Sequence, residues 1–476
     1  MSNVVLTEAK RRQLVEAYLQ GKAANVPPAH QIVRRPRGAI APLSLTQEEL
    51  WRRELRVPEI APLYNECVTV RMTGSLDVAA LERSFTEIVS RHEIWRTSFE
   101  TKAGEPVQII HPAMPVRLPL IDLRELPQAE RMTAALHHIG QDARRRFDLQ
   151  CEPPLRPTLA RIDDREYRLF LVAHLIVLDG MSAFQLFPLE LEVLYRAFLT
   201  GRASPLPELP IQCGDFAYWQ RECLNGEIGK QTIYWRKQLR DPLPGTKWPK
   251  EGLRPGTKTY HGAVWPFALS SELSERLREF APRANSTLFL TLLSGFAVLL
   301  HRRTSQNDII VGTLSPSGRK HAEVLKLLGY FLNPVALRFD FGNDPTFREL
   351  LAQARIVMSE AISNDDVPIE HLARELRQEH DPGPSPFFTA AISLQPPTPN
   401  LDLDWSVTTM DVGSGGSPWS LYLAFTDRPQ GILGRAQFDP DLVDAETLEA
   451  TVRDLQALLH ELTMNPSQRI SDISFV

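Results

Sequence analysis

The stretch that decides the fold is His174-Leu175-Ile176-Val177-Leu178-Asp179-Gly180. It completes an apolar run, Tyr167 to Leu175, that follows a second apolar run, Thr158 to Ile162, across a short polar loop. Two such runs predict a β-hairpin. The Asp-Gly turn then ends the strand, and Ser182 is in place to cap a helix that runs to about Thr200. A strand, a turn and a helix that meet in this way form a junction that commonly holds catalytic side chains.

Strands and helices on either side of this junction follow a related order. Before it we predict a strand at Cys67–Met72, a helix at Asp77–Arg91 and a strand at Arg96–Glu100; after it, a strand at Ala263–Leu269, a helix at Ser271–Phe280, an apolar helix at Leu288–Leu300 and a strand at Asp308–Thr313. This weak internal echo predicts two similar lobes of mixed α/β (α+β) structure. The proline-containing segment Arg202–Pro210 is the natural crossover between them.

The domain boundaries follow from the same features. Thr7 to Gln20 has the apolar spacing of an amphipathic helix, and the segment up to Ile40 is rich in proline and arginine, as in an extended linker. We therefore predict a helix and linker at 1–40, which could dock on an upstream partner, a first lobe at 41–205 and a second lobe at 206–476.

The composition is that of a globular protein. The chain has 476 residues, 43% of them hydrophobic and 23% charged, with a formal net charge of −5. An acidic balance gives no general attraction to nucleic acid or to an anionic membrane. The N-terminus has no signal-peptide pattern, and the longest apolar run, Leu288–Leu300, is shorter than the roughly 20 residues of a membrane span. The four cysteines form no C-x-x-C pair, so we expect reduced thiols in the cytoplasm.

At the central junction the chain resembles the condensation domains of non-ribosomal peptide synthetases, whose hallmark is H-H-x-x-x-D-G. Further elements resemble those of the family and stand in the family's order: Ser44–Trp51, Arg91–Phe99, Asp215–Gln220, Gly329–Arg338 and Asn364–Glu370. Cys213 stands where the family usually has a tyrosine. The likeness extends over residues 42–476.

The resemblance implies a fold of two chloramphenicol-acetyltransferase-like lobes in a V, with a substrate tunnel between them. It also implies acyl transfer from a phosphopantetheine thioester to an amine, with carrier proteins on the donor and acceptor sides and other synthetase domains as neighbours. No bound cofactor and no metal are implied, and phosphopantetheine would arrive on the carrier proteins. Ile470 to Ile473 resembles the sequence just before an adenylation domain.

Leu175 is the main departure from the family. It occupies the position of the second hallmark histidine, which in the family lies beside the attacking amine. Leucine can neither accept a proton nor hold an amine by a hydrogen bond, and general acid–base help is worth about 10²–10⁴ in rate. His174 is no simple substitute, because successive strand residues face opposite sides. If Leu175 faces the tunnel, we expect His174 to be a satisfied core histidine, with a direct role in catalysis as the alternative.

Other site residues are carried over from the resemblance. Asp179 is expected to brace the loop through a basic partner, for which Arg96 and Arg338 are the candidates, and Gly180 to permit the turn. Ser182, Asn333 and Ser420 are expected along the tunnel, with Ser420 in place of the family's usual acid.

Three hypotheses fit these observations. In the first, the chain is an amide-forming enzyme. The proton acceptor that Leu175 cannot provide is then water, the substrate's own amine or a residue from another segment. In the second, it is a condensation-like module that binds carrier proteins or recruits a tailoring enzyme without catalysis; such domains read near H-R-x-x-x-D-D, whereas this chain retains Asp179-Gly180. In the third, Leu175 is a laboratory substitution or a natural inactivating change. Whether the chain is an enzyme therefore depends on position 175.

Overall fold

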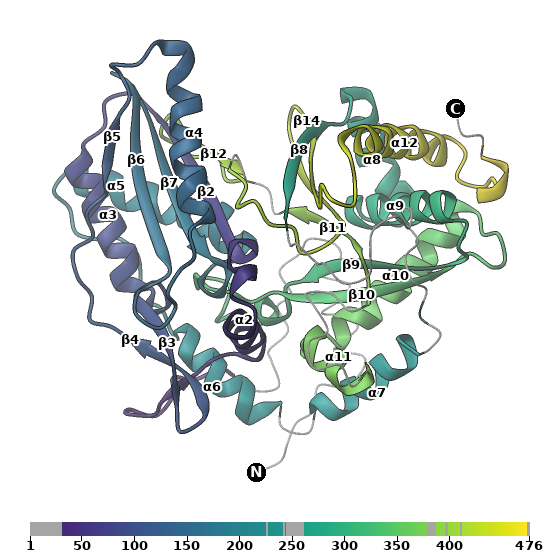
Figure 1. Ribbon diagram of the computed structural model, residues 1–476, viewed down its shortest axis with the longest axis horizontal. Coiled ribbons are helices and arrows are strands. Elements are labelled where there is room, and N and C mark those ends of the chain that lie inside the picture. Colours follow the sequence, from purple (N-terminus) through teal and green to yellow (C-terminus); the bar gives the residue numbers. More distant parts are fainter. Residues whose placement is uncertain are drawn as a thin grey trace.

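The computed structural model describes residues 31–224, 227–240, 243, 261–377, 387–395, 398–409 and 412–473. Figure 1 shows two lobes, each built around a β-sheet, that lie close together below and diverge above. The predicted mixed α/β fold with two lobes is confirmed. The helix predicted at Thr7–Gln20 lies outside the described residues.

The first lobe is built on a five-stranded sheet of order β12-β2-β7-β6-β5. Its strands are β2 (Asn65–Thr73), β5 (Leu120–Asp122), β6 (Leu155–Asp163), β7 (Glu166–His174) and β12 (Trp405–Thr409). The predicted hairpin is confirmed, because β6 and β7 pair antiparallel. A small second sheet, of order β1-β4-β3, consists of β1 (Ala41–Pro42), β3 (Thr97–Lys102) and β4 (Glu105–Ile110).

Helices pack around this sheet. α4 (Gln128–Arg144) packs against β2, β6 and β7, while α3 (Val78–Arg91) and α5 (Phe187–Leu199) pack on each other. Asp77 caps α3 by accepting a hydrogen bond from the Ala80 amide at 2.9 Å.

The second lobe is built on a six-stranded sheet of order β10-β9-β11-β13-β14-β8. Its strands are β8 (Ala263–Ala268), β9 (Asp308–Ser315), β10 (Asn333–Asp340), β11 (Ala390–Gln395), β13 (Leu421–Arg428) and β14 (Gly431–Phe438). The helices of this half are α7 (Glu227–Gln238), α8 (Ser271–Arg283), α9 (Leu288–Thr304), α10 (Phe347–Ser363), α11 (Ile369–Arg377) and α12 (Ala445–Met464). The apolar helix is α9, and its residues from Leu290 to Leu300 are buried in the lobe's core.

Segments that follow residue 205 also contribute to the first lobe. β12 pairs antiparallel with β2, and α6 (Cys213–Cys223) and residues 324–331 place apolar side chains in the first lobe's core. In the other direction, Arg374 on α11 forms an ion pair with Glu49 on α2 (Leu45–Arg56). The boundary predicted at residue 205 divides the sequence into two parts. In the folded protein, however, these segments cross from one lobe to the other and hold the lobes together.

No single helix of the described ranges is long and apolar enough to cross a membrane. α8 and α9 pass the test of length and composition only as a pair, bent by 106° at the break between them.

Candidate functional site

The central junction lies between the end of β7 and the start of α5. β7 ends at His174, residues 175–177 form a single 3₁₀ turn, and the Leu178 amide donates to the Leu175 carbonyl at 3.1 Å. A π-helical turn, Ser182–Leu186, then continues into α5. Ser182 was predicted to cap this helix, but the cap is Asp179, whose Oδ1 accepts from the Ser182 amide at 2.8 Å.

Asp179 is held by a buried arginine. Nη2 and Nε of Arg319 donate to its Oδ1 and Oδ2 at 2.7 and 2.9 Å, and both residues are almost fully buried. The Phe331 amide donates to the same carboxylate at 3.3 Å. This bidentate pair is the basic brace that the resemblance implied for the loop.

The basic partner itself was predicted wrongly. Arg96 donates to the His111 carbonyl, and Arg338 pairs with Asp308 at 2.6 Å on the second sheet. Neither reaches Asp179, because each is taken up by partners beside its own strand. Arg319 follows β9 in the short 3₁₀ turn Ser317–Lys320.

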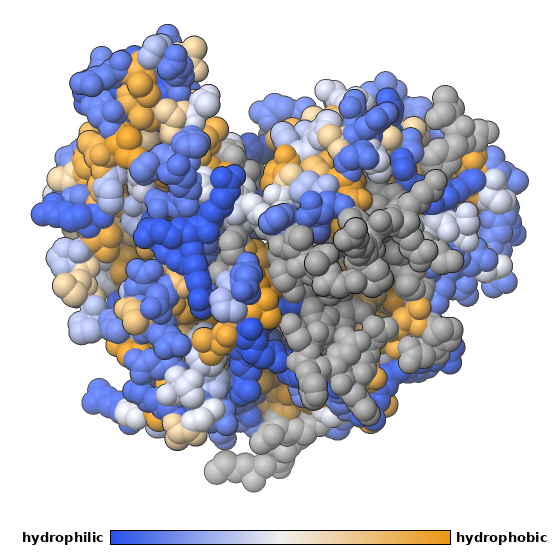
Figure 2. Space-filling model, viewed as in Figure 1, coloured by the Kyte–Doolittle hydropathy of each residue, from blue (hydrophilic) through white to orange (hydrophobic). Residues whose placement is uncertain are grey.

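A cavity between the lobes passes this junction. It encloses about 980 Å³ of empty space, its mouth included. The first part of the chain contributes Leu50, Leu63, Tyr64, Glu66, Leu175, Leu178, Asp179, Gly180, Ala183 and Phe184; the second contributes Leu314, Tyr330, Leu332, Pro334, Glu370, Gln395, Pro418, Trp419, Tyr422 and Gln437. The surface is hollowed between the lobes at the top of Figure 2.

Leu175 faces this cavity within an apolar cluster. It packs with Leu332 against a buried group that includes Leu50, Leu63 and Tyr330. The wall at this position is therefore apolar, whereas the family's histidine would present a ring nitrogen there.

His174 lies behind Leu175 and does not line the cavity. Its side chain is fully buried, Nε2 lies 3.0 Å from Glu54 Oε2, and Nδ1 accepts from the Ile176 amide at 3.1 Å. Burial alone would raise the pKa of Glu54, but the hydrogen bond and charge of His174, with Arg146, lower it below its ordinary value. His174 thus joins the sheet to α2.

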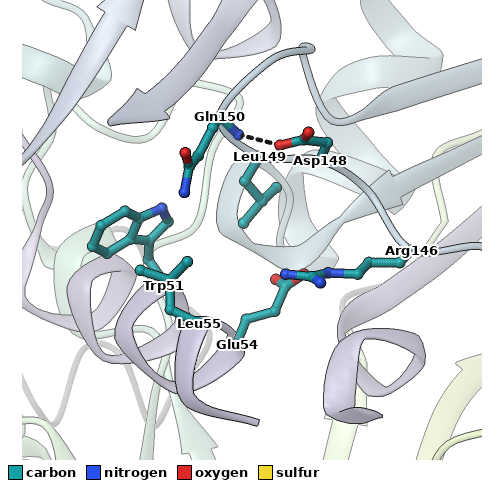
Figure 3. Close-up of a pocket in the computed structure, with 7 residues that line it drawn as sticks. All are labelled: Trp51, Glu54, Leu55, Arg146, Asp148, Leu149 and Gln150. Carbon is teal, nitrogen blue, oxygen red and sulfur yellow. Dashed lines mark hydrogen bonds and ion pairs between the residues drawn. The ribbon is translucent and has the colours of Figure 1, made fainter. Parts of the chain in front are cut away.

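The far side of Glu54 faces a small surface pocket (Figure 3). Arg146 lies there with Nε 3.3 Å from Glu54 Oε1. The rest of the wall consists of Trp51, Leu55, Asp148, Leu149 and Gln150. His174, Glu54 and Arg146 therefore form a chain of polar contacts that leads away from the central cavity.

Gly180 lines the cavity and has little free space above it. A β-carbon at this position would lie 2.9 Å from Gln395 Oε1. Gln395 in turn donates to Ser393 Oγ at 3.1 Å and to the Tyr422 hydroxyl at 3.3 Å. The glycine thus leaves room for a polar cluster on the second sheet.

The three predicted tunnel residues do not line this cavity. Ser182 is buried and its Oγ donates to the Gly329 carbonyl at 3.1 Å. Asn333 is also buried, and its Nδ2 donates to the carbonyls of Asp365 and Val367, both at 2.7 Å. Ser420 does not line the cavity either. Their chain neighbours Leu332, Pro334, Pro418 and Trp419 line the cavity instead. Leu332 and Pro334 stand on either side of Asn333, and adjacent residues of an extended segment face opposite sides.

The ionisable groups of the cavity other than Asp179 were not predicted, because no periodic pattern marks their positions. Burial raises the pKa of Glu66, although Arg435 opposes it, and burial with nearby Glu49 raises the pKa of Glu370 to about 7. Burial also raises the pKa of Tyr422 to about 12. Within the described residues, no group of three or more histidine, cysteine or acidic side chains is arranged to hold a metal ion.

Comparison with known proteins places this geometry in context. A family model described as "Condensation domain" matches residues 38–476. A linear gramicidin synthase polypeptide of Brevibacillus parabrevis is 38% identical over 435 residues, 90% of this chain and 8% of the synthase. Phosphinothricin tripeptide synthetase PhsC of Streptomyces viridochromogenes is 34% identical, over 99% of this chain and 43% of its own. The chain thus spans less than half of either relative.

Solved structures of related domains also resemble this chain. The X-domain from teicoplanin biosynthesis superposes with a TM-score of 0.80 at 27% identity, and the match covers 94% of this chain and 99% of the X-domain. The first condensation domain of the calcium-dependent antibiotic synthetase superposes with a TM-score of 0.79 at 21% identity, over 92% and 100% of the two chains. At that identity the second match supports the fold alone.

Proposed function

The chain belongs to the condensation-domain family of non-ribosomal peptide synthetases, and we propose that it joins a carrier-bound acyl group to the amine of a carrier-bound acceptor. The observation that carries this proposal is the cavity that runs between the lobes past Leu175 and the Asp179-Gly180 turn. Two phosphopantetheine arms that entered from opposite faces would meet at such a place.

The reaction is aminolysis of a thioester. The acceptor nitrogen attacks the thioester carbonyl, the carbon–sulfur bond breaks, and the sulfur leaves as the thiol of the donor's phosphopantetheine. One proton moves from nitrogen to sulfur, so no external oxidant or cofactor is needed. The largely apolar wall of the cavity would exclude water, which competes with the amine for the thioester.

The Asp179–Arg319 pair supports the chemistry without touching the substrates. It fixes the loop between Leu175 and α5, and Asp179 closes the first turn of the helical segment. We propose that its role is to hold the cavity wall in place. The carrier proteins would dock on the donor and acceptor sides of the domain, where basic side chains could meet acidic helices.

The residue at position 175 affects the rate of amide formation that we expect. Because a leucine cannot take the amine proton, the reaction should be slower by about 10²–10⁴ than in a chain with histidine there, unless another group acts. The test compares the protein with Leu175→His, using mass spectrometry to follow the product formed from donor-loaded and acceptor-loaded carrier proteins. Product from both, with more from the variant, supports the proposal. Absence of product from both, with verified loading and several donor and acceptor pairs, contradicts it.

A second candidate function is recruitment of a partner enzyme. The observation that favours it is the 27% identity to the X-domain from teicoplanin biosynthesis, a domain that has also been solved in a complex with OxyB. In this reading Leu175 marks a cavity that no longer serves catalysis. Size-exclusion chromatography with the pathway's tailoring enzymes tests it: a stable complex without amide product would favour recruitment. The gene sequence from the source organism would show whether Leu175 is natural.

A further inference from the structure

Glu66 and Leu175 lie on the same face of the first lobe's sheet. In the β2–β7 pair, Asn65 stands opposite His174 and Glu66 opposite Ala173. Asn65 faces α4, where its Nδ2 donates to the Ala143 carbonyl at 2.8 Å, and His174 faces α2. Side chains alternate along a strand, so Glu66 faces the other way, into the cavity that it lines with Leu175.

The register also brings the two residues close together. Leu175 follows Ala173 by two positions and lies one residue past the end of β7, so continuing the register places it next to the diagonal position of Glu66. Diagonal neighbours in an antiparallel pair are about 7–8 Å apart, within reach of a long side chain. A glutamate extended from position 66 can therefore place its carboxylate beside the space above Leu175.

The other acidic groups of the cavity are less suited to that space. Asp179 is occupied by Arg319 on both oxygens. Glu370 lies at the start of α11, where the charges that act on it are those of Glu49, Arg53 and Arg374. By contrast, the structure gives the Glu66 carboxylate no hydrogen bond or ion pair with any of the residues it describes.

We propose that the Glu66 carboxylate accepts the proton of the attacking amine, the task for which Leu175 has no group. This inference rests on the proposed amide-forming function. As the carbon–nitrogen bond forms, the proton passes from the acceptor nitrogen to a Glu66 oxygen. It then passes to the sulfur as the carbon–sulfur bond breaks, and the carboxylate is restored for the next turnover.

The surroundings of Glu66 favour this chemistry. Burial raises the pKa of Glu66, which makes its ionised form a stronger base than an exposed glutamate. From the second sheet, Arg435 on β14 and Tyr422 on β13 act electrostatically on the same space. The charge of Arg435 opposes the rise in the pKa of Glu66 that burial causes.

The experiment measures single-turnover amide formation with loaded carrier proteins. Glu66→Gln keeps the size of the side chain and removes the base, so we expect its rate to fall by about 10²–10⁴ with little change in the carrier concentration for half-maximal rate. Glu66→Asp should recover part of the rate. Glu166→Gln is the matched control, because Glu166 lies at the opposite end of β7 in a partly exposed pair with Arg71, and it should match the unmodified protein.

Two further measurements exclude a merely structural effect. The rate of the unmodified protein should rise with pH as Glu66 ionises, and this pH dependence should vanish in Glu66→Gln. The other titratable groups that line the cavity, Tyr64, Asp179, Tyr330, Glu370 and Tyr422, are present in both proteins, as is Arg435, whose charge acts on Glu66. Leu175→His should restore activity to Glu66→Gln, because the histidine supplies a second base in the same space.

Several outcomes would overturn the inference. Equal rates for Glu66→Gln and Glu166→Gln would remove Glu66 from the reaction while leaving the proposed function intact. If Glu370→Gln loses activity and Glu66→Gln does not, the group that accepts the amine proton is Glu370 on α11. Product from Leu175→His but none from the unmodified protein would show that Glu66 does not replace the histidine. If neither forms product, the proposed function fails as well.

Discussion

Asp179 and Arg319 form a bidentate ion pair with almost no solvent access, at 2.7 and 2.9 Å, although 140 residues of chain separate them. The pair joins the turn after β7 to the turn after β9. The loop that carries Leu175 is therefore positioned by the second half of the chain, and the cavity can form only when both lobes have folded together.

Arg319→Met is expected to destabilise the protein by about 3–5 kcal/mol. Removal of one member of a buried pair leaves the other charge unpaired, and the cost of that is greater than the net worth of the pair. Urea unfolding measures the loss. Arg117→Met is the control, because Arg117 pairs with Glu82 while its side chain is 87% exposed, and such pairs contribute about 0–1 kcal/mol. Equal values for the two variants would contradict the structural role given to Arg319.

Glu54 is expected to make the protein sensitive to acid. Burial would raise its pKa, but the hydrogen bond and charge of His174, together with Arg146, outweigh burial and hold the pKa below its ordinary value of 4.5 in the folded protein. The folded state then binds fewer protons than the unfolded state as the pH falls. The stabilisation is complete above pH 4.5 and is lost as the pH falls through the folded-state pKa.

Unfolding free energies measured from pH 6 to pH 3 check this dependence. Glu54→Gln should show a shallower decline over that range than the unmodified protein. An unchanged slope would mean that Glu54 is not ionised against His174 in the folded state.

Glu370 is expected to make the protein less stable as the pH rises, which is the opposite of the effect of Glu54. Its pKa is raised from 4.5 to about 7, first by burial and then by Glu49, so the folded state binds more protons than the unfolded state in this window. Stability should therefore fall as the pH rises from 4.5 to 7 and then level off. The shift corresponds to at most about 3 kcal/mol, less whatever water in the cavity screens.

Glu370→Gln should remove this loss. The variant is expected to be more stable than the unmodified protein at pH 8 and close to it at pH 4.5. Thermal melts at both values measure the difference. Equal melting temperatures at pH 8 would show that water reaches this carboxylate freely in the folded protein.

Local sequence patterns predicted the elements of the fold well and their long-range partners poorly. The strand periods of β6 and β7, the helical face of α3 and the apolar helix α9 are properties of short windows, and all were confirmed. The opposite orientations of His174 and Leu175 also agree with local alternation.

Contacts between distant segments have no such signature. Arg319 was not predicted as the partner of Asp179, because no local sequence pattern around Arg319 indicates a contact with a residue so distant in the chain. Arg96 and Arg338 were equally plausible cations. β12 pairs with β2, more than 300 residues earlier in the chain, and places Trp405 and Val407 in the first lobe's core. Glu66 lies near the start of β2, just before the predicted strand Cys67–Met72, and the pattern of that strand gives two faces but does not say which one meets the second lobe. The cavity wall is therefore visible only in the folded chain.

Gly180→Ala tests how closely the two lobes meet at the cavity. The new β-carbon would lie 2.9 Å from Gln395 Oε1, so the glutamine must move and give up its contacts with Ser393 and Tyr422. Because Gln395 has a flexible end, we expect a loss of about 1 kcal/mol in stability and a lower rate of amide formation. The matched background is Gln395→Ala, in which the added methyl group has space. In that background Gly180→Ala should cost almost nothing, and a double-mutant cycle measures the difference. If the two substitutions instead add independently, the contact between residue 180 and Gln395 does not limit the cavity.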